Sequence, residues 1–306
     1  MIIITAPVHS FLLTTLKDKG LDFDYAPGIS YAELYDKIEW ATGLVVSTRI
    51  EIDRNIIEKA KKLQWIGRLG SGMEIIDVEF AESRNIKCVS SPEGNRTAVA
   101  EQALGMLLSL MHHIRKSADE VKEGKWLRNE NRGTELSGKV VGIIGYGNTG
   151  SEFAGLLAPF NVQVLAVDKY KTGFSGNYVK ESNLDEVCTL SDVISFHLPL
   201  NKETLYYADA AFFKKLKRHP FIINTSRGKI VETGELIDAL KNNLIRGAAL
   251  DVLENEELST YNEKEKEMLQ FLTNQNNVIV TPHIGGYSHE ASYKMSRILL
   301  EKLDIL

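Results

Sequence analysis

Three glycines in the middle of the chain follow the pattern G-x-G-x-x-G: Gly145, Gly147 and Gly150. An apolar run typical of a strand, 139–144, leads into them, and a helical pattern, 151–158, follows. The next apolar run, 162–167, ends in Asp168. A strand, a glycine-rich turn, a helix, a second strand and a terminal acid in this order form the arrangement that binds a dinucleotide.

Each part of this arrangement has a physical role. Gly145 permits a tight turn, Gly147 lets the backbone approach a pyrophosphate, and Gly150 lets the helix pack closely on the sheet. The N–H groups and the dipole at the helix N-terminus favour the phosphates. The carboxylate of Asp168 accepts hydrogen bonds from ribose hydroxyls and repels a 2′-phosphate, so NAD is expected rather than NADP. We expect the intervening residues to line the cofactor as well: Tyr146, Asn148 and Thr149.

The central position of this turn predicts two domains in a chain of 306 residues. The preceding hundred residues alternate strand-like runs with helical patterns, which predicts a smaller parallel α/β sheet. Its expected strands lie at 2–5, 43–47, 65–69 and 87–89. Short apolar runs after the glycine turn are typical of buried parallel strands and extend the second sheet: 193–198, 221–224, 247–252 and 278–280.

A helical pattern from Thr97 to about Lys122 is expected to cross between the domains. Its apolar stripe predicts helix packing and comprises Ala103, Leu104, Leu107, Leu108, Met111 and Ile114. The polar segment 254–275 is expected to be a solvated surface helix, and the last 20 or so residues a helix that returns to the first domain. The predicted domains are therefore 1–97 with 283–306, and 98–282.

Composition excludes several classes of protein. With 43% hydrophobic and 25% charged residues the chain is typical of a soluble globular protein, and its net charge of −5 argues against nucleic-acid binding. The two cysteines, Cys88 and Cys188, do not suggest a disulfide framework. The chain opens on a strand-like run without a signal-type region, and no apolar run approaches the ~20 residues of a membrane span. We expect a cytoplasmic protein without a membrane partner.

Three side chains with catalytic potential follow strands of the second sheet: Arg227, Asp251 and His283. Ligands of open α/β sheets bind outside the carboxyl ends of the strands, so these side chains are expected to converge on the cofactor crevice. A guanidinium binds a carboxylate bidentately, and an imidazole exchanges a proton near neutrality. Hydride transfer to a 2-oxo acid requires both groups. Taken singly, an arginine after a strand more often forms a surface ion pair, and a histidine in a loop is usually an ordinary loop residue; the position of all three at strand ends of one sheet favours the catalytic interpretation.

The chain resembles the D-isomer-specific 2-hydroxyacid dehydrogenase family over nearly its whole length. The motifs that carry the resemblance are Gly70-Ser71-Gly72, Ala98-Val99-Ala100-Glu101, the glycine turn, His197-Leu198-Pro199-Leu200, Asn201-Lys202-Glu203-Thr204, Asn224-Thr225-Ser226-Arg227-Gly228 and Pro282-His283-Ile284-Gly285-Gly286. The resemblance implies a Rossmann NAD-binding domain and a smaller flavodoxin-like substrate domain.

The family's catalytic arginine and histidine fall on Arg227 and His283. Its glutamate, five residues past the aspartate of the Asp-Val segment, falls on Glu256, although Glu254 and Glu257 lie close by. The usual Glu-Pro pair is here Glu256-Glu257. Further cofactor contacts implied by the resemblance are His197, Leu198, Pro199, Thr204, Thr225, Ser226, Asp251, Gly285 and Gly286.

The implied substrate contacts are Ser71 and Gly72, together with Arg227 and His283. Arg49 is a candidate for binding a substrate phosphate, and an exposed loop arginine is an equally good interpretation. Ile75 stands where the family often has a polar residue, so we expect altered loop packing there.

The resemblance implies hydride transfer between NAD(H) and a D-2-hydroxy acid, with a 3-phosphoglycerate dehydrogenase-like activity favoured and a glyoxylate/hydroxypyruvate reductase as the alternative. A different class, an NAD-binding corepressor-like scaffold, also occurs in the family. A homodimer is expected, and the family's C-terminal regulatory domain is not expected because the sequence ends at Leu306.

Overall fold

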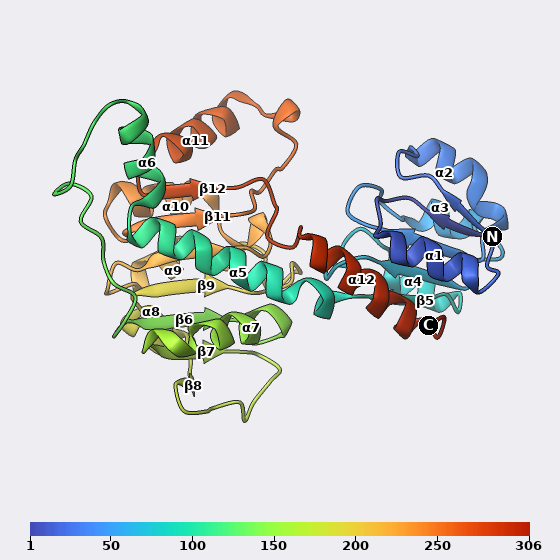
Figure 1. Ribbon diagram of the computed structural model, residues 1–306, viewed down its shortest axis with the longest axis horizontal. Helices are drawn as coiled ribbons and strands as arrows, with labels where there is room; N and C mark the ends of the chain where they lie inside the picture. Colours follow the sequence, from blue (N-terminus) through green and yellow to red (C-terminus); the bar gives the residue numbers. More distant parts are fainter. The chain divides into compact units, whose positions relative to one another are not determined.

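The computed structural model describes residues 1–306, which form two compact units. Unit 1 comprises Met1–Arg96 and Gly286–Leu306, and unit 2 comprises Thr97–Gly285. Figure 1 shows the blue N-terminal strands and the dark red C-terminal helix within the same unit. Residues 283–285, which the sequence prediction assigned to the substrate domain, lie in unit 2, because the N–H groups of His283 and Gly285 donate to Asp251.

Unit 1 contains a five-stranded parallel sheet in the order β2-β1-β3-β4-β5. This order is that of flavodoxin-like folds, as the sequence predicts. The central strands are buried along their length, as expected for a sheet covered on both faces. The strands are β1 (Ile2–Ile4), β2 (Phe23–Tyr25), β3 (Gly43–Val46), β4 (Trp65–Arg68) and β5 (Lys87–Ser90).

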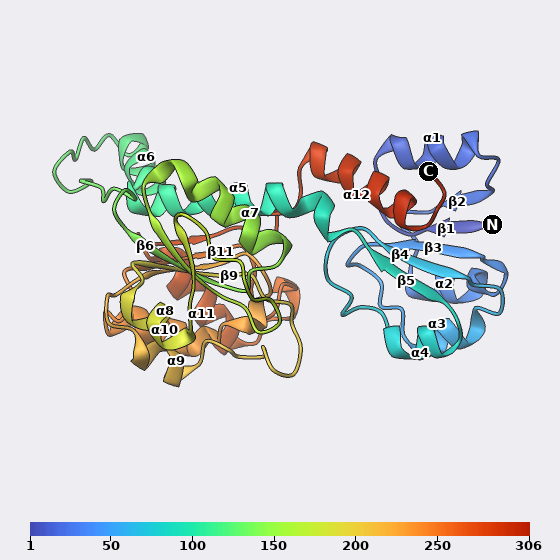
Figure 2. The same ribbon diagram turned by 90° about the horizontal axis from the view of Figure 1, so that it is seen from below.

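Helices cover both faces of this sheet. Figure 2 shows α1 and α12 on one face and α2, α3 and α4 on the other. Leu299 and Leu300 of α12 pack into one apolar cluster with Leu12 and Leu16 of α1, which joins the two ends of the chain. The helices are α1 (Ser10–Asp18), α2 (Tyr31–Lys37), the 3-10 turn η1 (Ile38–Trp40), α3 (Arg54–Lys59), α4 (Val78–Ser83) and α12 (His289–Lys302).

Unit 2 contains a seven-stranded parallel sheet in the order β12-β11-β10-β9-β6-β7-β8. Counted from β6, this is the Rossmann order 3-2-1-4-5-6 with one further strand. The order reverses between β6 and β9, where ligands of such sheets bind. The strands are β6 (Val140–Ile144), β7 (Gln163–Val167), β8 (Val179–Glu181), β9 (Val193–Phe196), β10 (Phe221–Asn224), β11 (Gly247–Leu250) and β12 (Val278–Val280).

The helices of unit 2 also form two layers. Figure 2 shows α5, α6 and α7 on one face of the sheet and α8 to α11 on the other. Their bounds are α5 (Pro92–Met111), α6 (Ile114–Lys122), α7 (Asn148–Leu157), η2 (Ala158–Phe160), α8 (Leu184–Leu190), α9 (Ala210–Lys215), η3 (Gly228–Ile230), α10 (Thr233–Lys241), η4 (Leu258–Thr260) and α11 (Glu263–Asn274).

The segment predicted as one helix from Thr97 to Lys122 is two helices. It breaks at His113, whose φ of 52° is left-handed and ends the α5 ladder. Ala103 and Leu107 of the predicted stripe are buried, whereas Ile114, beyond the break, is 55% exposed. The segment 254–275 is likewise helical only from Glu263 onward. A loop therefore precedes α11, and this loop carries Glu256.

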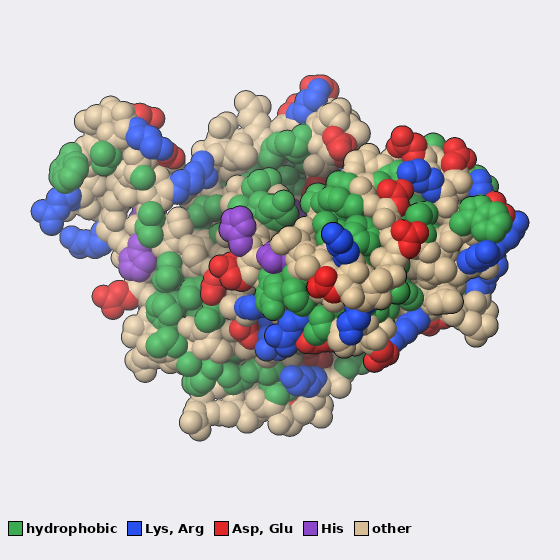
Figure 3. All heavy atoms as spheres, turned by 45° about the vertical axis from the view of Figure 1, so that its right-hand side comes forward, with side chains coloured by type: hydrophobic (Ala, Val, Ile, Leu, Met, Phe, Trp, Pro, Cys, Tyr) green, Lys and Arg blue, Asp and Glu red, His purple; other side chains and the backbone are tan.

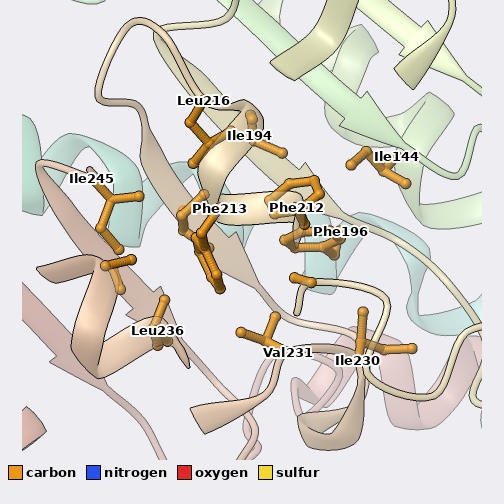
Figure 4. Close-up of a cluster of buried hydrophobic side chains, with 14 of the residues drawn as sticks. Ile144, Ile194, Phe196, Phe212, Phe213, Leu216, Ile230, Val231, Leu236 and Ile245 are labelled. Atoms are coloured by element: carbon orange, nitrogen blue, oxygen red, sulfur yellow. The ribbon is translucent and has the colours of Figure 1, made fainter. Parts of the chain in front are cut away.

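Aromatic side chains fill the layer between the unit 2 sheet and its α8–α11 face (Figure 4). The ring of Phe212 lies 5.5 Å from that of Phe196 on β9 and 5.5 Å from that of Phe213, both at tilted or edge-on angles. Burial of each such ring contributes about 1.5–3 kcal/mol to folding. This packing holds β9 and β10 in place, and the carboxyl end of β9 lies beside that of β6, where the strand order reverses.

On the face that Figure 3 shows, Lys and Arg side chains lie interspersed with Asp and Glu. Among the helices, none combines the length and the apolar character that crossing a bilayer requires.

Candidate active site

The glycine turn connects β6 to α7 at the point where the strand order reverses. Gly145 has a φ of +95°, and a Cβ added to it would lie 2.3 Å from the carbonyl oxygen of His197. A Cβ on Gly150 would lie 2.0 Å from the Gly145 carbonyl oxygen. Gly147, at the N-cap of α7, is exposed, and a Cβ there would meet no atom within 4 Å. Two of the glycines thus allow close packing, and the third leaves the helix N-terminus open.

Asp168, at the end of β7, holds this turn. Its Oδ2 accepts a hydrogen bond of 2.7 Å from the N–H of Tyr146, and its Oδ1 accepts bonds from the N–H groups of Tyr170 and Lys171 at 2.9 and 3.0 Å. The carboxylate thereby fixes the carboxyl ends of β6 and β7 beside each other. The two oxygens of a carboxylate offer about four acceptor sites in all, and three are used here, so a further donor such as a ribose hydroxyl can still bind.

His197 follows β9 and is buried beneath the first turn of α7. Its Nε2 lies 2.9 Å from Ser195 Oγ, and its Nδ1 lies 3.3 Å from Thr149 Oγ1. Burial lowers the pKa of His197 to about 3, so the ring is neutral. The sequence interpretation placed His197 against the cofactor. In the structure the ring of His197 connects β9 with α7 through Ser195 and Thr149, and the carbonyl of His197 lies against Gly145.

The neighbouring turn is closed by its own side chains. Thr204 Oγ1 donates to the carbonyl of Pro199 at 2.6 Å, and Asn201 Oδ1 accepts from the N–H groups of Glu203 and Thr204. Leu198 packs against the core of unit 2, while Pro199 is exposed. Of the motif His197–Thr204, the exposed tip is therefore the part that a ligand can reach.

The segment after β10 is held by Asn224. Its Oδ1 accepts hydrogen bonds from the N–H and the hydroxyl of Ser226 at 3.1 and 2.8 Å, and its Nδ2 donates to the Arg227 carbonyl at 2.9 Å. The Arg227 guanidinium is half-buried, and Nη1 donates to the Ser226 carbonyl at 2.7 Å. The hydroxyl of Thr225 is buried and has no hydrogen-bond partner. A buried hydroxyl of this kind is costly unless a ligand satisfies it.

Asp251, which follows β11, is almost fully buried and organises the loop after β12. Its Oδ1 accepts hydrogen bonds from the Thr281 hydroxyl at 2.5 Å and the Ile284 N–H at 3.0 Å, and its Oδ2 accepts from the Gly285 N–H at 2.7 Å. Its carbonyl accepts from the His283 N–H at 2.8 Å. The sequence interpretation gave Asp251 a cofactor contact; the observed role of its carboxylate is to shape this loop. Sequence reasoning did not single out Thr281.

His283 lies in this loop with a φ of 55°, a left-handed conformation that a non-glycine residue adopts only when its surroundings enforce it. Its Nδ1 donates to Glu256 Oε2 at 2.8 Å. Glu254 is engaged elsewhere, because its carboxylate accepts from the Thr233 N–H and the Tyr206 hydroxyl at 2.6 and 2.9 Å. Glu257 accepts from Ser259 Oγ at 2.5 Å. Of the three glutamates considered, the structure pairs Glu256 with His283.

The remaining candidate residues lie in unit 1. Arg49 is exposed, and its Nη2 donates to the Thr5 carbonyl at 3.1 Å. Ser71 is exposed and Gly72 is buried, in the loop after β4. Ile75 packs against the apolar core of unit 1, which accounts for an apolar side chain at that position. Gly286 opens the C-terminal segment of this unit, whereas Gly285 belongs to unit 2.

Comparison with known proteins identifies the family. The sequence profile of the D-isomer specific 2-hydroxyacid dehydrogenase NAD binding domain matches residues 104–285. D-3-Phosphoglycerate dehydrogenase of Methanocaldococcus jannaschii is 32% identical over 305 residues, 99% of this chain and 56% of that protein. Hydroxypyruvate reductase of Thermotoga maritima is 34% identical over 262 residues, 85% of this chain and 83% of that protein. The chain thus spans just over half the length of the D-3-phosphoglycerate dehydrogenase from M. jannaschii.

Solved structures agree with the fold. The TT0316 protein of Thermus thermophilus has a TM-score of 0.87 at 27% identity, with 99% of this chain and 95% of that chain covered. D-Lactate dehydrogenase of Aquifex aeolicus, complexed with NAD and lactic acid, has a TM-score of 0.84 at 25% identity, with 99% and 94% covered. The α/β fold and the family resemblance predicted from the sequence are confirmed. The chain belongs to the D-isomer specific 2-hydroxyacid dehydrogenase family, and unit 2 contains the NAD binding domain of that family.

Proposed function

We propose that the protein is an NAD-dependent oxidoreductase that transfers hydride between nicotinamide and a D-2-hydroxy acid or its 2-oxo acid. The observation that carries this proposal is the hydrogen bond of 2.8 Å between His283 Nδ1 and Glu256 Oε2. It lies at the carboxyl edge of the same parallel sheet whose β6 leads into the glycine turn. An imidazole oriented by a carboxylate at its Nδ1 presents Nε2 for proton transfer.

Unit 2 fits a dinucleotide. The open position at Gly147 and the N-terminus of α7 suit a pyrophosphate, with the N–H groups of Asn148 and Thr149 as its donors. Asp168 would accept the ribose hydroxyls, and the unpartnered Thr225 hydroxyl offers a further polar contact. When bound, NADH supplies the hydride.

The chain's own side chains would handle the proton and the substrate carboxylate. In the reducing direction the proton on His283 Nε2 passes to the 2-oxo oxygen as the carbonyl carbon receives hydride, and in the oxidising direction Nε2 takes this proton back. Glu256 fixes the tautomer and stabilises the imidazolium. Arg227 can hold the substrate carboxylate through its guanidinium fork.

Unit 1 is our proposed substrate domain. The N–H groups around Ser71 and Gly72 are candidates for binding the carboxylate. Arg49 is the candidate cation for a phosphorylated substrate, since only one of its donors is used for the Thr5 carbonyl.

We favour a 3-phosphoglycerate dehydrogenase-like activity, supported by several similar proteins of that name, over hydroxypyruvate or glyoxylate reduction, which the T. maritima relative supports. The test is oxidation of NADH and NADPH with phosphohydroxypyruvate, hydroxypyruvate, glyoxylate and pyruvate. Preference for phosphohydroxypyruvate that is lost in Arg49→Ala supports the first activity. If the wild type and Arg49→Ala use the unphosphorylated acids equally well, the result supports hydroxypyruvate or glyoxylate reduction. No turnover of any of these acids refutes the enzymatic proposal.

The protein is also proposed to be a homodimer. Bulky apolar side chains on α6 and the following loop are exposed, with 78% of Trp126 accessible, and a second copy would cover them: Ile114, Val121, Trp126 and Leu127.

The free thiols of Cys88 and Cys188 support the predicted cytoplasmic location.

A further inference from the structure

The loop that carries Glu256 has no regular structure between β11 and η4, yet the side-chain amide and the main-chain carbonyl of the preceding residue, Asn255, are all hydrogen-bonded. The amide Nδ2 of Asn255 donates to Thr260 Oγ1 at 3.0 Å and to Glu265 Oε1 at 3.2 Å. Its Oδ1 accepts from the Glu257 N–H at 3.0 Å. The Tyr261 hydroxyl donates to the main-chain carbonyl of Asn255 at 2.6 Å. Both amide protons and both oxygens of Asn255 are therefore used.

These bonds connect the loop to a fixed element. Glu265 is the third residue of α11, and its Oε2 accepts from the Asn262 N–H at 2.8 Å in a capping box. Its other oxygen receives the Asn255 amide. The hydrogen bonds from Asn262 and Asn255 lower the pKa of Glu265, so it stays ionised as an acceptor. The position of Asn255 is thus set by the start of α11.

A pocket borders the loop on one side. Its volume is about 90 Å³, and its lining includes the apolar side chains of Leu253, Met268, Leu269 and Leu272 and the polar side chains of Asn255, Tyr261 and Glu265. Asn255 and Tyr261 thus face open space on that side, where the hydrogen bonds described above restrain them.

The residue after Glu256 explains why such a restraint is needed. The related family pattern has proline here, whose ring fixes its own φ, whereas this chain has Glu257, whose φ of −94° is not fixed by a ring. The Glu257 N–H, which a proline would lack, is the group that Asn255 Oδ1 binds. The hydrogen bond between Asn255 and Glu257 therefore connects the two residues that flank Glu256 in the sequence.

We infer that Asn255 is a positioning residue: its hydrogen bonds to Glu257, Glu265 and Tyr261 hold Glu256 at the distance from His283 that proton transfer requires. This inference rests on the proposed function. Asn255 itself touches neither the imidazole nor the substrate, and it acts through the orientation of Glu256. Without the Asn255 side chain, the half-exposed carboxylate of Glu256 would hydrogen-bond to His283 for only part of the time and to water for the rest.

The test compares Asn255→Ala and Tyr261→Phe with the wild type and with a control in the same loop, Ser259→Ala, whose hydroxyl contacts only Glu257. Two quantities are measured: kcat with the best 2-oxo acid, and the proton NMR resonance of the His283 Nδ1–H, assigned by its absence in His283→Gln. NADH affinity and Tm are the folding controls. Tyr261→Phe keeps the ring and removes one donor, so it tests the role even if Asn255→Ala unfolds.

We expect kcat to fall about 10-fold in Asn255→Ala, since small misplacements of catalytic groups cost up to ~100-fold, and less in Tyr261→Phe. The Nδ1–H resonance should broaden or vanish in both, with NADH affinity and the Ser259→Ala control unchanged. A wild-type resonance and kcat in both variants would overturn the inference, and so would a parallel loss of NADH binding. If the wild type reduces no 2-oxo acid, the proposed function fails, and the resonance alone still tests the positioning role.

Discussion

Alanine at two glycines of the turn between β6 and α7 should separate cofactor binding from folding. At Gly147 an added methyl group meets no atom within 4 Å. Alanine is a poorer N-cap than glycine by about 0.5–1 kcal/mol, and the smaller entropy of the unfolded chain offsets about 0.4–1 kcal/mol. The net change in the free energy of unfolding should therefore stay within about 1 kcal/mol.

The same methyl group would occupy the place into which a pyrophosphate must come. Displacing the phosphates from one N–H donor of α7 removes a charge-assisted hydrogen bond worth about 1.5–3 kcal/mol. This corresponds to a Kd for NADH raised by about 10- to 100-fold. The Kd is measured by fluorescence titration, with Tm followed in parallel.

At Gly150 the order of effects reverses. The added Cβ would lie 2.0 Å from the Gly145 carbonyl, a backbone atom that cannot rotate away. Overpacking of this kind costs about 1–3 kcal/mol, which lowers the Tm of a domain of this size by about 3–10 °C. Wild-type NADH affinity in Gly147→Ala, or wild-type stability in Gly150→Ala, would refute the assignment of these roles.

Four further outcomes are expected. His283→Gln should lower kcat by about 10²–10⁴-fold while NADH binding persists, and near-wild-type turnover would contradict its role as acid and base. Because burial lowers the pKa of His197 from 6.5 to about 3, the unfolded chain binds the proton at higher pH than the folded chain. Stability is then fully present above about pH 6.5 and is lost as the pH falls toward 3; urea unfolding of His197→Gln should show a weaker acid loss, and an equal loss would argue against burial as the cause. Asp168→Asn should improve the ratio of NADPH to NADH use by about 10-fold, equal to ~1.4 kcal/mol, in steady-state kinetics; an unchanged ratio would mean that the charge does not select the cofactor. Trp126→Asp should convert a dimer to a monomer in light scattering, and a persistent dimer would place the interface elsewhere.

The strands that border the crevice could be predicted because their apolar runs are buried on both faces. The edge strands β2, Phe23–Tyr25, and β8, Val179–Glu181, were missed, since each has only three residues and is only partly buried. The break at His113 was missed for a different reason. Its left-handed backbone is not encoded by glycine or proline, and the apolar spacing continues through it.

The candidate site could be predicted as far as residue types at strand ends allow. The five-residue spacing of the related family selected Glu256 over Glu254 and Glu257, and in the structure Glu256 is the one that pairs with His283. Asn255 and Thr281 carried no signal in the sequence, because their side chains bind groups that only the tertiary fold brings near. Sequence patterns report burial and periodicity well, and networks between loops poorly.

The discontinuity of unit 1 has a consequence for synthesis on the ribosome. Unit 2 is one unbroken segment, so it can fold as soon as it has left the exit tunnel. The apolar cluster of unit 1 that contains Ile4, Leu12 and Leu16 is instead completed only after Leu299 and Leu300 have been synthesised. Leu299 also seats against Gly67, where a Cβ would lie 2.9 Å from its side chain. Residues 1–96 thus leave the ribosome before unit 2 but complete their core after it, and until then the apolar side chains of this cluster remain exposed.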